Sequence, residues 1–304
     1  MQQPKNCGQV CGQVCGQSPF WEKKHIMGVV NVTPDSFSDG GKFININSAI
    51  EHGFTLVQQG ASILDIGGES TRPGAETIGI QAEIDRICPV IEGLRGAAEW
   101  ISVDTRNSQT MRAAIKAGAT LVNDISALRH DSESVNVIKE AKVPVCLMHM
   151  QGQPSCMQKK PSYNNAVEEI YQFLQDRISY CDTNCIETKM ILADPGIGFG
   201  KTLEHNLLII RNIREFLGLR VPLVVGLSRK SMIGALDDDV PVDNRLAGSL
   251  AGALWCLQND VQVFRVHDVR ETQQAFRIYQ AILEAEQLSV SESEKISSSA
   301  SMAL

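Results

Sequence analysis

No run of 18 consecutive apolar residues occurs in the 304-residue sequence, so we expect no transmembrane helix. The first 20 residues also lack the apolar segment of a secretory signal. Basic residues are in the minority, with 28 Lys and Arg against 35 Asp and Glu, and the formal net charge is −7. This charge argues against non-specific binding to nucleic acid or anionic membranes, which requires a basic surface. We therefore expect a cytoplasmic protein that binds neither nucleic acid nor membrane.

A disulfide framework is also missing, because the nine cysteines are odd in number and scattered. Cys7, Cys11 and Cys15 lie in a threefold CGQ repeat, but a zinc site there would lack a fourth ligand and the usual two-residue spacing. We interpret residues 1–20 as a disordered tail and the Ser-rich residues 289–304 as another. Residues 21–288 remain as a single domain.

Short apolar runs alternate with helical patterns along this domain. The expected strands are 26–31, 62–66, 100–104, 120–124, 145–148, 190–194, 223–226 and 263–266. Continuous apolar runs are typical of parallel strands that are covered on both faces. Eight such units predict an α/β fold, a (β/α)8 TIM barrel with two disordered tails. A doubly wound sheet is the alternative, but the turn after the first strand reads NVTPDSFSDGG and lacks the GxGxxG pattern.

Polar side chains follow most of the expected strands. In a (β/α)8 barrel, the carboxyl ends of the strands and the loops after them form the active site. One group at these positions is cationic and indicates an anionic ligand such as phosphate: Arg72, Lys230, Arg265 and His267. Arg265 and His267 are two residues apart, so a strand projects both to the same side. The alternative for Arg265 is a surface ion pair.

A second group at the strand ends consists of Asp104, Asn123 and Asp194. These side chains could read the donor-rich edge of a heterocycle, because a carboxylate can accept two parallel N–H bonds. A single Asp at a strand end can equally cap the next helix. The convergence of several such residues at one end of the barrel favours a binding site.

Two features resemble known sites without meeting their patterns. Residues 195–202 read PGIGFGKT, but the first position is Pro, so the phosphate-binding pattern GxxxxGK[ST] fails. We interpret the glycines as allowing a tight turn or the close approach of a ligand. His149 has no neighbouring His or Cys to complete a metal site, and we interpret it as structural.

These residues lie in segments that closely resemble the dihydropteroate synthase family. The segments are MGVVNVTPDSFSDGG (27–41), DIGGESTRPGA (65–75), SVDT (102–105), NDISAL (123–128), MHMQGQP (148–154), ADPGIGFGKTLEHNL (193–207), GLSRKSMIG (226–234) and FRVHDV (264–269). The resemblance runs from about His25 to Leu288, and the first and sixth of these segments are highly specific to the family.

The resemblance implies a transferase of folate biosynthesis. Such an enzyme joins 6-hydroxymethyl-7,8-dihydropterin diphosphate to p-aminobenzoate and gives 7,8-dihydropteroate and pyrophosphate. It implies that Asn31, Arg265 and His267 bind the diphosphate, with Mg²⁺ between the diphosphate and Asn31. Because one amide oxygen is too weak to fix Mg²⁺, the ion should arrive with the substrate. The alternative for Asn31 is a turn residue before Thr33 and Pro34.

The resemblance also implies the remaining sites. The pterin is expected to bind to Asp104, Asn123, Asp194 and Lys230, and the catalytic set is expected to be Asn31, Asp104, Asp194 and Lys230. Carbon–oxygen cleavage leaves positive charge on the pterin methylene, which buried carboxylates can stabilise. The arylamine is neutral at pH 7 and already nucleophilic, so we assign no general base.

The p-aminobenzoate pocket is expected at Phe37, Thr71, Arg72, Pro73, Phe199 and Ser231. Family members are usually homodimers and targets of sulfonamides.

Two other functions compete with this prediction. A methyltransferase of the wider pterin-binding group would share the Asp and Asn positions, but it has no reason to keep the Arg-x-His at 265–267 or the SRKS at 228–231. A catalytically silent pterin-binding or regulatory barrel would be expected to lose Asn31, Lys230 or Arg265, and all three are present.

Overall fold

The computed structural model describes residues 18–32, 42–69, 78–154 and 156–301. Within these ranges, eight parallel strands form one sheet in the order β6-β5-β4-β3-β2-β1-β8-β7. The strands are β1 (His25–Asn31), β2 (Ile63–Gly67), β3 (Trp100–Asp104), β4 (Leu121–Asp124), β5 (Val145–Met148), β6 (Ile191–Asp194), β7 (Val224–Gly226) and β8 (Val263–Val266). A parallel bridge between Ala193 and Leu223 joins the two outer strands and closes the sheet. The predicted (β/α)8 barrel is therefore confirmed.

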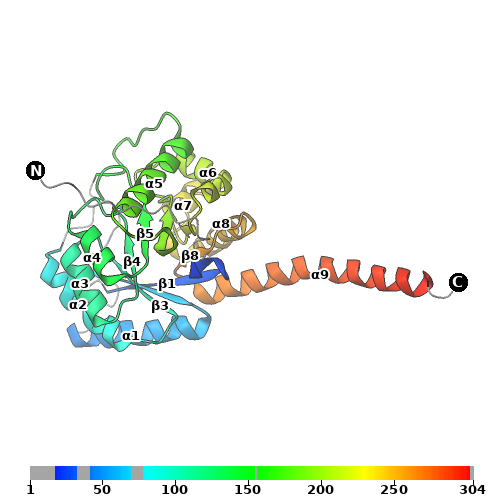
Figure 1. The fold of residues 1–304 in the computed structure, drawn as a ribbon, viewed down its shortest axis with the longest axis horizontal. Coiled ribbons are helices and arrows are strands. Elements are labelled where there is room, and N and C mark those ends of the chain that lie inside the picture. Colours follow the sequence, from blue (N-terminus) through cyan, green and yellow to red (C-terminus); the bar gives the residue numbers. More distant parts are fainter. Residues whose placement is uncertain (1–17, 33–41, 70–77, 155, 302–304) are drawn as a thin grey trace, which may run out of the picture.

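Helices cover the outside of this barrel (Figure 1). They are α1 (Lys42–Gln59), α2 (Ile80–Gly93), α3 (Ser108–Ala117), α4 (Ser134–Ala141), α5 (Ala166–Thr183), α6 (Leu203–Arg211), α7 (Ser231–Leu236), α8 (Leu246–Gln258) and α9 (Val269–Ser301). Short 3-10 helices are η1 (Pro19–Trp21), η3 (Thr188–Met190), η4 (Ile213–Leu219) and η5 (Val242–Asn244). Among the described helices, none combines the length and the apolarity needed to cross a lipid bilayer.

Alternation along the strands divides the barrel into an apolar base and a polar top. Side chains two residues apart on a strand share a face, so every second residue points into the barrel. At the base the interior is filled by Phe20, Met27, Ile63, Leu121, Cys146, Leu192, Val224 and Val263. Two residues further along the same strands the apolar side chains give way to Asp65, Asn123, Asp194 and Arg265. The apolar base thus supports a polar layer at the carboxyl ends of the strands.

The base of the barrel is closed by η1. Phe20 is completely buried, and its ring lies 4.8 Å from the ring of Trp100 and 5.5 Å from that of His25. Burial of Phe20 packs η1 against the barrel, one residue before the expected start of the domain at residue 21. Composition did not reveal this, since a single aromatic residue after a Gly- and Gln-rich segment carries no periodic signal.

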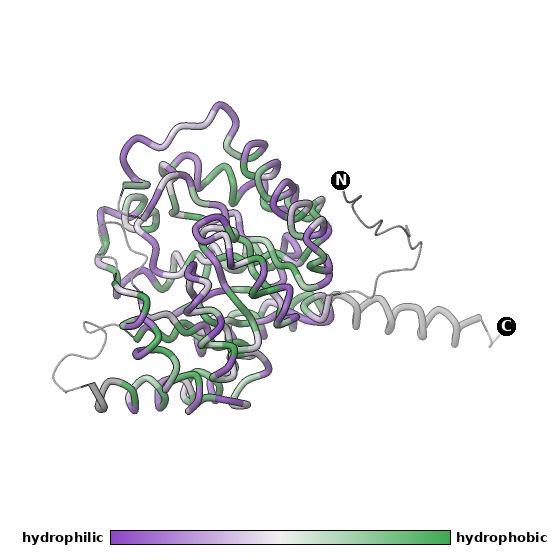
Figure 2. Tube along the Cα trace, turned by 60° about the vertical axis from the view of Figure 1, so that its left-hand side comes forward, coloured by the Kyte–Doolittle hydropathy of each residue, from purple (hydrophilic) through white to green (hydrophobic). Residues whose placement is uncertain are grey.

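At the other end of the chain, α9 continues beyond Leu288 to Ser301. It passes through most of the segment whose Ser-rich composition predicted a tail, and this part of the helix projects away from the barrel (Figure 1). The connection between β5 and α5 also stands out from the barrel. It forms the loop at the top of Figure 2, where its colour is mostly hydrophilic.

Candidate functional site

The polar side chains predicted to form the site converge because the strands are in register. Asn31 pairs with Gly67, Gly67 with Asp104, and Asp104 with Asn123 across four adjacent strands. On the other side of the barrel, Asp194 ends β6. Arg265 lies within β8, and His267 follows the end of that strand. The structure thus brings these predicted residues to one end of the barrel, as the sequence indicated.

Arg265 is the centre of a charged network inside the barrel mouth. Its Nε donates to Asp65 Oδ2 at 2.6 Å, and its Nη2 donates to Asp104 Oδ2 at 2.9 Å. Asp65 also accepts from Ser102 Oγ at 2.6 Å and from Asn123 Nδ2 at 3.2 Å. The alternative of a surface ion pair is wrong for Arg265, because Asp65 is fully buried and Asp104 nearly so.

Asp65 is a functional residue that the sequence analysis missed. It lies in β2, two residues before the strand end, and it joins Arg265 to Asn123. A carboxylate in the middle of the apolar segment ILDIG was a usable signal, since buried charges are paired or bound to ligands.

Burial changes the acid–base behaviour of Asp104. Loss of hydration, opposed by the Arg265 guanidinium and assisted by the charge of Asp65, raises its pKa to about 7. A carboxyl group with this pKa is partly protonated at neutral pH. It can therefore accept or donate a hydrogen bond, depending on the ligand.

Asp194 and Lys230 form the second charged group. Asp194 Oδ1 accepts from the backbone N–H of Gly196 at 2.7 Å, and burial raises the pKa of this carboxyl against the opposing charge of Lys230. Lys230 donates to the carbonyl of Ile197, and its Nζ lies 4.9 Å from the centroid of the Phe199 ring. Burial lowers the pKa of Lys230 to about 8, with Asp194 opposing the shift. Lys230 is thus mostly charged at pH 7 and loses its charge in mildly alkaline solution.

His267 is held by the loop that precedes Lys230. Ser228 Oγ lies 3.0 Å from His267 Nδ1 and accepts from the His267 backbone N–H at 3.1 Å. A second link joins the same two loops, since Arg229 Nε donates to Asp268 Oδ2 at 3.0 Å. The loops after β7 and β8 are therefore fixed to each other, and Lys230 and His267 with them.

The residues predicted for the p-aminobenzoate pocket are described only in part. Phe199 is half-buried beside Lys230, and Ser231 is exposed as the first residue of α7. Phe37, Thr71, Arg72 and Pro73 lie outside the described residues. Their roles stay predictions, as do the ligand assignments of the other site residues.

The described residues offer little to a metal ion by themselves. None of them forms a group of three or more His, Cys, Asp or Glu side chains suited to metal binding. Asn31 lies half-buried at the end of β1 and could supply one amide oxygen. Such a donor set fits a hard cation that brings its other oxygen ligands from a bound phosphate and water.

Comparisons with known proteins show which family this chain resembles. The pterin binding enzyme family matches residues 27–267. Dihydropteroate synthases from Haemophilus influenzae and Escherichia coli are 44% and 43% identical over 261 and 264 residues. These alignments cover 86% of this chain and 94% and 93% of the two relatives.

Solved structures of similar proteins share the fold. The dihydropteroate synthase of Xanthomonas albilineans, solved with 4-aminobenzoic acid, is 41% identical with a TM-score of 0.81, covering 86% of this chain and 94% of its own. The Yersinia pestis enzyme, solved in complex with a sulfonamide drug, is 42% identical with a TM-score of 0.81. It covers 87% of this chain and 96% of its own.

Proposed function

The chain belongs to the dihydropteroate synthase family, and from this premise we propose how its side chains carry out the reaction. The enzyme condenses 6-hydroxymethyl-7,8-dihydropterin diphosphate with p-aminobenzoate in folate biosynthesis. The bond between the pterin methylene carbon and the diphosphate oxygen breaks, and a bond from the arylamine nitrogen to that carbon forms. Pyrophosphate leaves, and the amine proton passes to solvent.

Asp194 is proposed to bind the donor-rich edge of the pterin. One of its oxygens accepts from the backbone N–H of Gly196, and the other would accept from the pterin. Paired N–H donors would favour the charged form of this buried carboxyl, whose pKa burial raises. Asn123 and Asp104 complete the contacts to the ring, and Lys230 donates to its acceptor atoms.

The diphosphate is proposed to bind to Arg265 and His267. Arg265 uses two of its five N–H groups on Asp65 and Asp104, which leaves three for phosphate oxygens. The network thus holds the guanidinium in a fixed plane before the substrate arrives. Such preorganised donors stabilise the charge that develops on the leaving diphosphate.

Mg²⁺ is proposed to be held by Asn31 together with the substrate phosphates, which fits the single amide oxygen that this residue offers. When bound, the ion would neutralise charge on the leaving group.

The arylamine is proposed to enter beside Phe199 and Ser231, with Phe37, Thr71, Arg72 and Pro73 completing the pocket. Sulfonamides, one of which was solved with the Yersinia pestis relative, are then expected to compete with p-aminobenzoate.

The observation that carries the proposed roles is the Asp65–Arg265–Asp104 network beside Asp194 and Lys230. The test is pyrophosphate release by the purified protein, given the dihydropterin diphosphate and Mg²⁺, with and without p-aminobenzoate. Release that depends on the arylamine supports the proposal. Pterin binding without release would favour methyl transfer or a silent binding protein instead.

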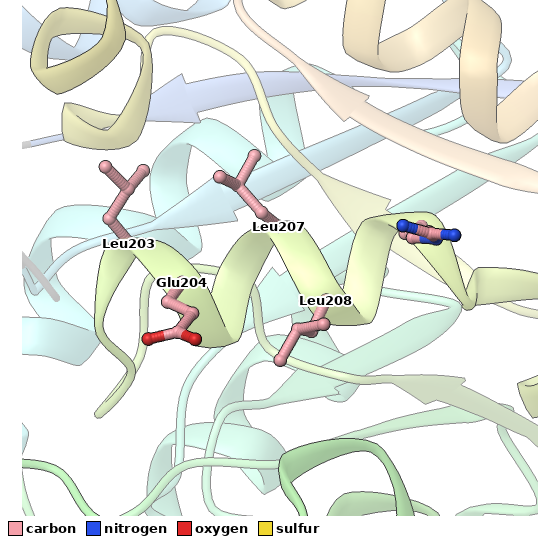
Figure 3. A pocket seen from close by; sticks show the side chains of 5 residues that line it. Leu203, Glu204, Leu207 and Leu208 are labelled. Carbon is pink, nitrogen blue, oxygen red and sulfur yellow. The ribbon is translucent and has the colours of Figure 1, made fainter.

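We also propose a homodimer that forms through the outer faces of α6 and α8. α8 contains no charged residue, yet Trp255 is 45% exposed on it, and its indole N–H donates to the carbonyl of Ile210 at the end of α6. On α6, Leu207 and Leu208 are also exposed. Figure 3 shows Leu203 and Leu207 side by side on one edge of that helix.

Exposed leucine and tryptophan side chains on two adjacent helices are typical of an interface between subunits. Sedimentation of the purified protein tests it, since a monomer at micromolar concentration would contradict the proposal. The cytoplasmic location and the absence of nucleic-acid or membrane binding stay predictions from the sequence.

A further inference from the structure

The loop between β6 and α6 is held by side chains along its whole length. We call residues 195–200 the glycine loop. Its four consecutive carbonyls from Ile197 to Gly200 each accept a hydrogen bond from a different side chain. The donors, in the order of the carbonyls, are Lys230 Nζ, Gln158 Nε2, Lys201 Nζ and Tyr163 Oη.

The glycines let this loop lie directly on the backbone that follows β5. Gly196, Gly198 and Gly200 have φ values of +69°, +83° and +63°, which L side chains rarely adopt. A Cβ atom on Gly196 would lie 1.9 Å from the carbonyl oxygen of His149, so no larger residue fits there. The glycine loop and the segment at His149 are thus packed backbone to backbone.

Lys201 is the buried member of the set of donors. It is only 3% exposed, although it stands where the lysine would be in the phosphate-binding pattern GxxxxGK[ST], which this segment does not complete. Its Nζ lies 2.9 Å from the carbonyl oxygen of Phe199, 2.9 Å from His149 Nδ1 and 3.4 Å from the His149 carbonyl oxygen. An ammonium group has three donors, and here three uncharged acceptors surround it. The side chain therefore turns back under the glycine loop.

His149 is suited to act as the partner of this ammonium group. Its ring is 6% exposed and packs edge-on against Phe173 at 4.8 Å. Burial and the nearby Lys201 charge lower the pKa of His149 to about 2, so the ring is neutral at any working pH. When Lys201 is charged, its Nζ donates to Nδ1, and the ring proton then lies on Nε2. The structural role predicted for His149 is thus to pair with the buried side chain of Lys201.

Burial lowers the pKa of Lys201 well below its usual value, and the charge of Asp194 opposes this shift without a direct hydrogen bond. Burying a lysine among three uncharged acceptors is costly, which indicates that the position serves a purpose beyond stability. On its other side, the glycine loop carries the Phe199 ring and the Ile197 carbonyl, and both contact Lys230. We propose that Lys201, with His149 as its neutral acceptor, is a positioning residue that fixes the glycine loop and thereby the places of Phe199 and Lys230. This inference rests on the proposed function, in which Phe199 borders the arylamine.

The test compares Lys201→Met with the matched control Lys159→Met, which removes an exposed lysine from the neighbouring β5–α5 connection. We expect Lys201→Met to raise KM for p-aminobenzoate at least tenfold and the control to change it less than twofold. The Kd of a free pterin should rise less than this KM in Lys201→Met, because Asp104 and Asn123 lie on β3 and β4 while only Lys230 depends on Phe199 and Ile197 of the glycine loop. In the control this Kd should not change. A purely structural role would reduce the fraction of active enzyme, and hence kcat, without changing KM, and that result would overturn the proposal.

A second pair of variants keeps the proposal testable if Lys201→Met fails to fold. The amide oxygen of Asn occupies nearly the position of His Nδ1, so His149→Asn should keep KM for p-aminobenzoate within threefold of the wild type. His149→Leu removes the acceptor and should reproduce the tenfold rise. Equal KM values in the two variants would contradict the role of the Lys201–His149 pair.

Hydrogen exchange separates this proposal from the proposed function, because it needs no activity. Amides of residues 196–200 should exchange at least tenfold faster in Lys201→Met or His149→Leu than in Lys159→Met. Unchanged exchange would refute the positioning role even in an active enzyme. Failure of the wild type to release pyrophosphate would refute the proposed reaction while leaving the exchange result to decide on Lys201.

Discussion

Replacing Asp65 by Asn tests whether this buried carboxylate positions Arg265. Asp65 accepts from Arg265 Nε and Ser102 Oγ, each at 2.6 Å, and from Asn123 Nδ2 at 3.2 Å. An amide can keep its oxygen for Arg265 and Asn123 and donate its NH₂ group to Ser102 Oγ, but the negative charge that faces the Arg265 guanidinium is lost. The lost charge-assisted bond corresponds to about 1.5–3 kcal/mol, and breaking a buried ion pair costs about 3–5 kcal/mol.

For Asp65→Asn we expect a loss near the boundary of these two ranges, at about 2–3 kcal/mol. Arg265 keeps its bond to Asp104, and its side chain is 23% exposed, so water screens part of the unpaired charge. We expect the free energy of unfolding to fall by about 2–3 kcal/mol and the midpoint of thermal unfolding by about 5–10 °C. With one of its two anchors lost, Arg265 should bind the diphosphate less well. We expect kcat/KM for the pterin diphosphate to fall about 10–100-fold, equivalent to about 1.4–2.8 kcal/mol.

The assay is pyrophosphate release, and Asp124→Asn is the matched control. Asp124 is an equally buried carboxylate at the end of β4, but it accepts from the backbone N–H groups of Ser126 and Leu128. The control should lose comparable thermal stability while its kcat/KM stays within about threefold of the wild type. A normal kcat/KM in Asp65→Asn would show that Arg265 does not depend on Asp65 and would refute the reasoning.

The same variant has a signature in the pH dependence of stability. The pKa of Asp104 is raised to about 7 in the folded protein, with the charge of Asp65 among the causes. The folded state therefore binds a proton that the unfolded chain has already lost above about pH 4, and stability falls as the pH rises towards 7. Removing the charge of Asp65 should lower the pKa of Asp104 and make this fall smaller, which denaturant unfolding between pH 4 and pH 8 can measure.

Three further predictions follow from the geometry. Affinity for the pterin diphosphate should decline as the pH rises through about 8, where Lys230 loses its charge, and Lys230→Arg should remove this decline in a titration of binding against pH. Asp194→Asn should weaken binding of a free pterin by about 1.5–3 kcal/mol in calorimetry. Arg265→Ala and His267→Ala should weaken binding of the diphosphate substrate much more than binding of the free pterin. Equal losses of affinity for both ligands would indicate misfolding. Phe20→Ala should lower the free energy of unfolding by about 3–5 kcal/mol, because it empties the base of the barrel, and an unchanged midpoint in denaturant would contradict that role.

The fold was predictable because its signals are local. Each expected strand lies within two residues of an observed one, and the runs at Trp100–Asp104, Val145–Met148 and Val263–Val266 coincide with theirs. Apolar runs of this length bury a parallel strand on both faces, whatever the rest of the chain does. The polar residues at the strand ends were predictable for the same reason, since all parallel strands of a barrel direct their carboxyl ends to one side.

Contacts across the barrel were not predictable in this way. Arg265 and Asp65 are 200 positions apart in the sequence, and their strands are separated by β1. Period-two alternation tells which side chains face the interior but not which of them meet there. The contact between Lys201 and His149 was not predictable for a similar reason. The direction of the Lys201 side chain depends on the φ angles of the preceding glycines, and the sequence alone does not determine these angles.

The positions of the charged side chains on the barrel connect this fold to the proposed chemistry. The carboxylates of Asp65, Asp104 and Asp194 lie on strands, and Arg265 lies among them on β8, whereas Lys230 and His267 lie in loops beyond the strand ends. In the proposed binding mode, Asp104 and Asp194 face the pterin together with Lys230, and Arg265 and His267 face the diphosphate. A reaction in which the carbon–oxygen bond breaks early places positive charge on the methylene, near the carboxylates, and negative charge on the leaving group, near Arg265 and His267. The proposed arrangement would thus stabilise departure of the diphosphate before the arylamine attacks, and it needs no general base.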